Sequence, residues 1–188
     1  MKTLKWILGI LLALLLLGYF FGMPYLREQT KKHSPEREAV YEASGITLEV
    51  HYSAPYKKGR QIFGELVPYN RVWRTGANEP TTFTTSHAVE VGGQPLPAGT
   101  YSLWTIPNPE AWTLILNSEI PDWGATLLSG GRKTTRNPDT DVLEVVVPAL
   151  NLPDPVEQLT LEFQIVRSEV VLLLSWDQTQ IMVPIRPN

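Results

Sequence analysis

An irregular stretch of the sequence, NRVWRTGANEPTTF, concentrates side chains that could do chemistry. Arg74 offers a guanidinium, whose planar fork recognises a carboxylate or a phosphate through two hydrogen bonds. Trp73 adds an aromatic face that suits a sugar ring or a cation. These residue types predict a polar binding pocket floored by Trp73. The residues predicted to line it are Arg60, Trp73, Arg74, Asn78 and Glu79, with Trp123 from a second long loop as a further stacking surface.

The same stretch also allows a purely structural interpretation. Arg74 and Glu79 can form an ion pair that ties the loop to the domain. Trp73 can be a core residue, because Arg-Val-Trp alternates like a short strand. Gly76 or Asn78 is expected at positive φ in a tight turn, and the glycine spacing does not match a phosphate-binding P-loop. The pocket and the structural network both remain open at this point.

Catalytic motifs are sparse. No serine lies in G-x-S-x-G, the arrangement of an activated nucleophile. Glycoside hydrolysis needs two carboxylates about 5 to 9 Å apart, and Glu79 with Asp122 or Glu65 could supply them. A hydrolase acting on envelope polysaccharide or on a small ester is therefore the alternative to a binding module.

The histidines and cysteines offer no metal motif. His33, His51 and His87 belong to no H-x-H or H-E-x-x-H pattern. His51 and His87 could meet across a sheet, but a surface position is the expectation for each. The chain has no cysteine, which excludes disulfides and thiolate ligands. We predict no metal and no cofactor.

Composition restricts the class of protein. The chain is 43% hydrophobic and 19% charged, which excludes wholesale disorder. Its net charge of −3 and pI near 5.6 provide no global field for nucleic acid, so no nucleic-acid partner is predicted. The 16 prolines and 13 glycines fall between short apolar runs, which is typical of an all-β protein.

Residues 1–26 are predicted to be a signal anchor. The segment 6–26 carries no charge, and at about 1.5 Å per residue it can span a hydrocarbon core of about 30 Å. The alternative is a cleaved signal peptide, although small residues at both −3 and −1 of a cleavage site are lacking. The membrane is therefore the predicted partner of residues 6–26.

The orientation of this anchor rests on opposing signals. Two lysines precede the span, but more basic residues follow it, which opposes export of the domain under the positive-inside rule. The short N-terminal flank and the polar spacer at 27–42 favour export. We predict a single-pass protein of the cell membrane with its domain in the periplasm or on the cell surface, or secreted if the segment is cut.

The remainder of the chain, residues 43–188, is predicted to be one β domain. The spacer before it is expected to contain a short helix from Ser34 to Tyr41. From Ile46 the apolar period changes to two, and similar short runs recur to the C-terminus. VVLLLSW and QIMVPI are expected to form a hairpin closed by Asp-Gln-Thr. The pattern predicts an antiparallel β-sandwich of Greek-key or jelly-roll type, with a small closed barrel as the alternative.

Two segments lack strand alternation, 53–80 and 117–141, and long loops on a rigid scaffold commonly carry function. The string KGRQIFGELVPYNRVWRTGANEPTTF begins in the first segment and ends just beyond it; it is followed by VGGQPLPAGTYSLWTIP, WTLILN and DWGA. Together these motifs resemble the bacterial domain of unknown function 2911, over about residues 46–163. The resemblance implies a β-rich domain outside the cytoplasm and assigns no activity or catalytic residue.

The leading hypothesis is a binding or envelope-assembly module whose partner is a glycan or another envelope component.

Overall fold

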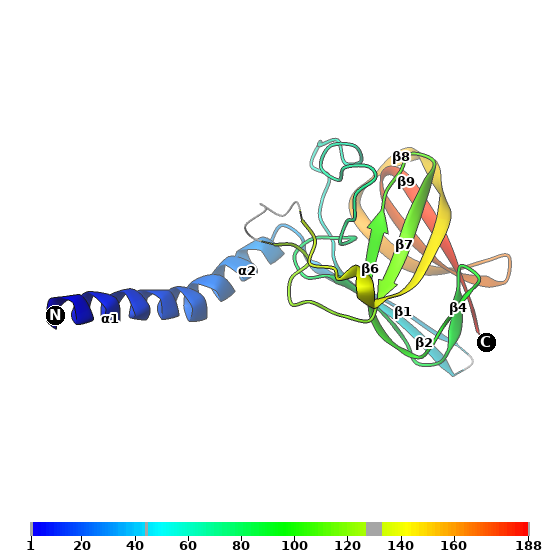
Figure 1. Ribbon diagram of the computed structural model, residues 1–188. Helices are drawn as coiled ribbons and strands as arrows, with labels where there is room; N and C mark the ends of the chain where they lie inside the picture. Colours follow the sequence, from blue (N-terminus) through cyan, green and yellow to red (C-terminus); the bar gives the residue numbers. More distant parts are fainter. Residues whose placement is uncertain (1, 44, 127–132, 188) are drawn as a thin grey trace. The chain divides into compact units, whose positions relative to one another are not determined.

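The computed structural model describes residues 2–43, 45–126 and 133–187. Its contacts divide the chain into two compact units, Met1–His33 and Ser34–Asn188. The first unit is helical, and the second is built mainly of β-strands with one short 3-10 helix, η3 (Pro138–Thr140), among the described residues (Figure 1).

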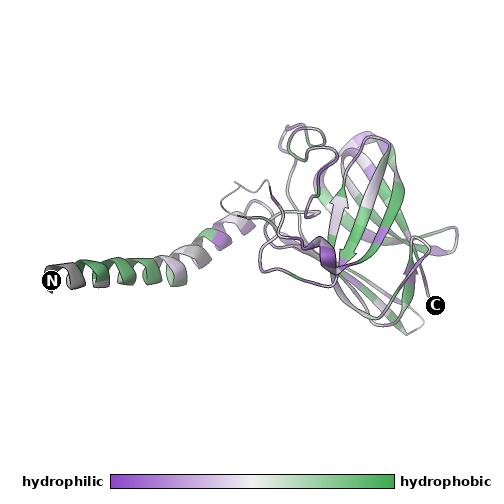
Figure 2. Cartoon of the chain, viewed as in Figure 1, coloured by the Kyte–Doolittle hydropathy of each residue, from purple (hydrophilic) through white to green (hydrophobic). Residues whose placement is uncertain are grey.

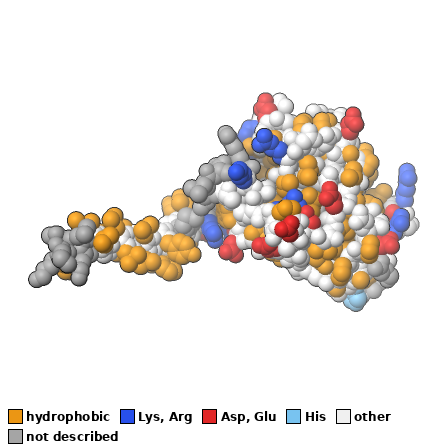
Figure 3. Space-filling view, viewed as in Figure 1, with side chains coloured by type: hydrophobic (Ala, Val, Ile, Leu, Met, Phe, Trp, Pro, Cys, Tyr) orange, Lys and Arg blue, Asp and Glu red, His pale blue; other side chains and the backbone are white. Residues whose placement is uncertain are grey.

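The helical unit contains α1 (Lys2–Leu17), a π-helical turn η1 (Gly18–Gly22) and α2 (Met23–Lys31). The segment Trp6–Lys31 is long and apolar enough to cross a membrane, and a signal sequence meets the same criterion. Its 26 residues correspond to about 39 Å of helix. Apolar side chains cover α1 and η1 and are exposed (Figures 2 and 3). The prediction of an N-terminal apolar helix is confirmed.

The second unit is a nine-stranded antiparallel sheet in the order β1-β2-β3-β6-β7-β8-β9-β4-β5. This confirms the all-β, antiparallel prediction. The strands are β1 (Glu36–Ala43), β2 (Ile46–Ser53), β3 (Thr81–Thr85), β4 (Val89–Val91), β5 (Gln94–Leu96), β6 (Gly99–Ile106), β7 (Ala111–Asn117), β8 (Asp141–Val166) and β9 (Glu169–Pro187).

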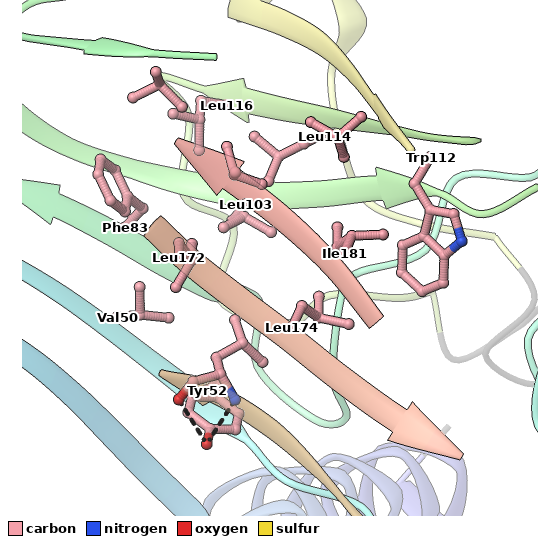
Figure 4. Close-up of a cluster of buried hydrophobic side chains, with 14 of the residues drawn as sticks. Val50, Tyr52, Phe83, Leu103, Trp112, Leu114, Leu116, Leu172, Leu174 and Ile181 are labelled. Carbon is pink, nitrogen blue, oxygen red and sulfur yellow. Dashed lines mark hydrogen bonds between the residues drawn. The ribbon is translucent and has the colours of Figure 1, made fainter. Parts of the chain in front are cut away.

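The sheet folds over along β8, which pairs first with β7 and then with β9. Within its pairing with β9 the register of β8 shifts at Asn151/Val156 and at Val156/Thr160, and such bulges bend a strand. Side chains from both halves of the sheet therefore pack into one core (Figure 4). β1 and β5 remain the two edges of the sheet, so the described strands do not form a closed barrel.

Tyr52 links the two halves inside this core. Its hydroxyl donates to the carbonyl of Leu161 at 3.3 Å and accepts from the Leu161 N–H at 3.1 Å (Figure 4). The phenol is buried, and this burial raises the pKa of Tyr52. One side chain on β2 thus satisfies backbone polar groups of β8 at the point where the halves meet.

The helix expected from Ser34 to Tyr41 is wrong, because Glu36–Ala43 forms β1. β1 pairs with β2 over its whole length, from Glu36 opposite Ser53 to Ala43 opposite Ile46. Tyr41 packs against the core while Val40 faces solvent. Pairing with β2 overrides a local pattern that also suits a helix. The β unit consequently begins at Ser34, within the segment expected to be a spacer.

The hairpin expected at Asp-Gln-Thr is also wrong. VVLLLSW and QIMVPI belong to one strand, β9, and Asp177 adopts a positive φ of 52° within it. The turn of the hairpin lies instead at Arg167 and Ser168, between β8 and β9, where both residues have positive φ. Gly92 and Gly93, both with positive φ, join β4 to β5.

Candidate functional site

Trp73 packs into the end of the core. It bridges to Thr105 of β6 through two backbone hydrogen bonds of 2.7 and 2.9 Å. Its ring stacks on Trp176 with centroids 5.9 Å apart, and it meets Phe63 and Trp112 edge-on at 6.1 Å. Its indole N–H donates to the carbonyl of Gly76 at 3.2 Å. From the sequence Trp73 could be the floor of a pocket or a core residue. These contacts support the core position.

The turn that follows is held by buried hydroxyls. Thr75 is completely buried and has a φ of 56°, which is unusual for a β-branched residue. Its hydroxyl pairs with that of Thr105 at 3.0 Å, and the Thr81 hydroxyl donates to the Thr75 carbonyl at 2.8 Å. A Cβ added at Gly76 would lie 2.9 Å from the carbonyl oxygen of Ser53. These contacts leave the turn little freedom to change shape.

Asn78 completes the turn with a φ of 58°, as predicted for Gly76 or Asn78. Its side-chain amide is buried and donates to the carbonyl of Ser34 at 3.5 Å. This contact ties the turn to the segment that precedes β1.

The second long loop meets this turn at Gly124. The Gly124 N–H donates to the carbonyl of Asn78 at 3.2 Å. A Cβ added at Gly124 would lie 2.5 Å from Cδ of Arg74, so the glycine lies against the arginine stem. Trp123, expected to be exposed, is half-buried, and its carbonyl accepts from the Thr135 hydroxyl at 2.6 Å. The two loops thus bring Arg74, Asn78 and Trp123–Gly124 together.

Arg74 is a largely buried cation at this junction. Burial lowers the pKa of its guanidinium. Its Nε has no hydrogen-bond partner, and no ion pair joins it to Glu79 among the described contacts. Arginine stays charged in proteins, and buried charges are normally paired. The Arg74–Glu79 ion pair considered from the sequence is thus not among these contacts, although Glu79 itself is half-buried and has interactions of its own.

Three other residues predicted to act at the site make no described contact with this junction. The exposed guanidinium of Arg60 donates to the carbonyls of Tyr56 and Lys57, which fastens its own loop. Glu65 and Asp122 are exposed. No hydrogen bond or ion pair within the described residues joins Arg60, Glu65 or Asp122 to the turn at residues 74–79.

Sequence reasoning missed a second cluster, on the outer face of β1 and β2. His51 Nε2 lies 2.7 Å from Glu49 Oε1 and 3.5 Å from Glu38 Oε1. A hydrogen bond between the two carboxyl groups raises the pKa of Glu38, and the same bond together with one to His51 lowers that of Glu49. The alternation in ITLEVHY placed Glu49 and His51 on one face, but Glu38 had been assigned to a spacer. His87 lies elsewhere, on an exposed turn beside Ser86.

Comparison with known proteins identifies the chain only at the level of a family. No curated protein and no solved structure matches it. The family described as protein of unknown function (DUF2911) matches residues 34–185, which is nearly the whole β unit and includes both long loops. The chain therefore belongs to the DUF2911 family.

Proposed function

We propose that this protein is a membrane-anchored binding module that recognises an anionic group of an envelope component at the junction of its two long loops. Arg74 is the residue that binds the anion, and the ligand group is a carboxylate or a phosphate. The observation that carries the proposal is the buried guanidinium of Arg74, whose Nε lacks a hydrogen-bond partner among the described residues.

Among the described residues no ion pair is formed by Arg74. A buried cation without a counter-ion is costly, because the protein interior does not replace the hydration that the charge loses. An anionic ligand would restore this lost interaction and would gain two parallel hydrogen bonds from the guanidinium. The surrounding turn supports such a role, because Thr75, Gly76 and Asn78 hold the backbone beside Arg74 in one conformation. A site held in its binding geometry before the ligand arrives loses less entropy on binding.

The location forms part of the same proposal. The apolar segment Trp6–Lys31 supports attachment to a membrane, with the β unit outside the cytoplasm. The mass of the mature N-terminus separates an uncut anchor from a cleaved signal, since only the former retains residues 1–26. Protease added to intact cells with a permeabilised outer barrier would digest an exported β unit and would spare a cytoplasmic one.

Binding is tested with the full-length protein in detergent, using inorganic phosphate, acetate, oligosaccharides of uronic acids and matched neutral oligosaccharides. A ligand at 100 times its Kd stabilises the folded state by about 2.7 kcal/mol, which corresponds to about 5–10 °C in Tm at this size. We expect that shift with one of the anionic probes, and we expect Arg74→Gln to abolish it. Arg60→Gln is the matched control, because within the described part of the chain the guanidinium of Arg60 hydrogen-bonds only to its own loop. Equal shifts in wild type and Arg74→Gln would contradict the proposal.

The alternative is a hydrolase that uses Glu79 together with Asp122 or Glu65. No described contact between these carboxyl groups supports it. Asp122 and Glu65 are exposed, and neither is joined to Glu79 among the described contacts. We therefore propose binding and not turnover as the activity of the junction.

A further inference from the structure

We propose that Glu38, Glu49 and His51 form a binding site for a divalent first-row transition-metal ion, of the Zn²⁺ class, on the outer face of β1 and β2. This site involves no residue of the loop junction. The proposal is independent of the binding function proposed above.

The backbone brings these three side chains together. Glu38 on β1 is paired directly with His51 on β2 in the antiparallel register. Glu49 lies two residues before His51, and alternate residues of a strand share a face. The intervening Val50 and its neighbours Leu48 and Tyr52 are buried in the core, so β2 cannot rotate to separate the outer side chains. The positions of all three Cα atoms are therefore set by the fold and not by a flexible loop.

The distances suit a metal ion. One ligand atom from each residue lies within 4.8 Å of the others, and the measured separations from His51 Nε2 are 2.7 Å to Glu49 and 3.5 Å to Glu38. Zn²⁺ binds nitrogen and oxygen at about 2.0–2.1 Å, so two ligand atoms of a tetrahedral site lie about 3.3 Å apart. The observed values lie on either side of this distance. Adjustments of a few tenths of an ångström in exposed side chains are sufficient to accommodate the ion.

The charges also favour a bound cation. Glu38 is opposite His51, and the Glu49 carboxyl on the same strand as His51 is its diagonal neighbour, with the ligand atoms of all three residues within 4.8 Å of one another. Two acidic groups so close repel each other when both are ionised. Within the described part of the chain, the ion pairs of Glu38 and Glu49 involve only His51, which carries a charge only when protonated. No lysine or arginine forms an ion pair with either carboxylate there. A divalent ion would neutralise both carboxylates while neutral His51 binds it through nitrogen.

The ligand set selects the class of metal. One imidazole and two carboxylates suit Zn²⁺ and its first-row neighbours better than Ca²⁺ or Mg²⁺, which prefer all-oxygen sites. His51 and Glu38 have about half of their side-chain surface exposed, 53% and 48%. A fourth coordination position would therefore be open to water or to a ligand from another molecule, as in metal sites with three protein ligands.

The test uses the full-length protein without a histidine tag, in detergent at a pH near 7.5. Isothermal titration with Zn²⁺ should show one site per chain, and Co²⁺ should give a visible absorption band with nitrogen and oxygen ligands. His51→Gln, Glu38→Gln and Glu49→Gln should each weaken binding at least tenfold, since changes to outer-shell partners alone cost about 10–100-fold. His87→Gln and Glu42→Gln are the controls, because they remove an exposed histidine and an exposed β1 carboxylate outside the cluster.

Glu38 and His51 are exposed and Glu49 is half-buried, so substitution of any of the three should leave the metal-free Tm unchanged within about 1–2 °C. The proposal is overturned if wild type takes up no Zn²⁺ saturably. It is equally overturned if the Glu38→Gln/His51→Gln double variant binds as wild type does, or if His87→Gln weakens binding as much as His51→Gln. In any of these outcomes the cluster is a set of contacts between His51 and two carboxyl groups that binds no metal.

Discussion

Replacing Arg74 by methionine is the sharpest test of whether this arginine serves binding or the fold. Methionine keeps an unbranched stem to lie against Gly124 and removes only the charged head. Because Nε of Arg74 has no described partner, its removal breaks no hydrogen bond at that atom. Replacing buried charges by apolar residues of similar volume is commonly neutral, or stabilising by about 1–4 kcal/mol.

Arg136 provides the matched comparison. Its guanidinium pairs with Asp141, and the two side chains are only 13% and 21% exposed. Asp141 also accepts from the amide of Asn117 at 2.7 Å, so the pair belongs to a network that fastens the second long loop. Arg136→Met leaves the Asp141 carboxylate partly buried and short of a partner, which costs about 3–5 kcal/mol for a buried pair. The same chemical change should thus have opposite consequences at the two sites.

The measurement is thermal and urea denaturation of the full-length variants in one detergent. At about 2–4 °C per kcal/mol for a chain of this size, Arg136→Met should lower Tm by about 6–20 °C. Arg74→Met should leave Tm unchanged or raise it by a few degrees, while abolishing stabilisation by the anionic ligand. A fall in Tm for Arg74→Met as large as that for Arg136→Met would refute the reasoning, because Arg74 would then support the fold.

Three further changes test the packing around the site. Trp73→Ala should cost about 3–5 kcal/mol in urea denaturation, because it removes one ring of the cluster with Phe63, Trp112 and Trp176; a loss below 1 kcal/mol would contradict the packing role. Gly76→Ala should cost about 1–3 kcal/mol, since the new Cβ meets the Ser53 carbonyl at 2.9 Å and backbone cannot easily give way; unchanged stability would show a looser turn. Tyr52→Phe should cost about 1–3 kcal/mol at pH 8 by leaving backbone groups of Leu161 without the hydroxyl. Burial raises the pKa of Tyr52 above its ordinary value near 10, so its neutral form is favoured in the folded state. Its contribution is therefore complete below about pH 10 and is lost as the pH rises through the folded-state pKa, and the stability gap between wild type and Tyr52→Phe should narrow above pH 10.

The β-strands were predictable where one face is buried and the other is exposed. In β2 the buried Leu48, Val50 and Tyr52 alternate with Thr47, Glu49 and His51, so period two is visible in the letters. β1 escaped prediction because most of its side chains are exposed: only Ala39 and Tyr41 are half-buried, and Tyr41 packs against the core. Its state is decided by pairing with β2, which is a tertiary contact with no local signal.

Three prolines hide the full length of β8 from local sequence rules. Between VLEVVV and LTLEFQIV the chain carries Pro148, Pro153 and Pro155, which local rules interpret as a break between strands. The structure keeps both runs in β8 and uses this region for the register shifts that bend the sheet. Proline is tolerated at bulges, where a ladder hydrogen bond is already lost. A break in the pattern and a bend in one strand look alike in sequence.

The loop junction shows the same limit for a site. Arg74, Asn78 and Glu79 are close in sequence, so a tight turn was enough to predict that they share a region. The approach of Gly124 depends on a loop that starts more than forty residues later, and no pattern in either loop specifies it. Arg60 illustrates the converse, because proximity in sequence suggested a shared pocket whereas its guanidinium binds the backbone of its own loop.

The residues that depart from local rules gather in one turn of the β unit. Thr75 holds a positive φ that costs a β-branched residue on the order of 1–3 kcal/mol, and Arg74 beside it carries a buried charge. Both persist because Thr105 and Thr81 fix the turn through buried hydroxyl groups, and Gly124 leaves room for the arginine stem. An apolar residue at 74 would satisfy the packing at lower cost. Since natural sequences accept such costs mainly where function requires them, the placement of Arg74 next to strained backbone favours a ligand over a structural role as the reason for its charge.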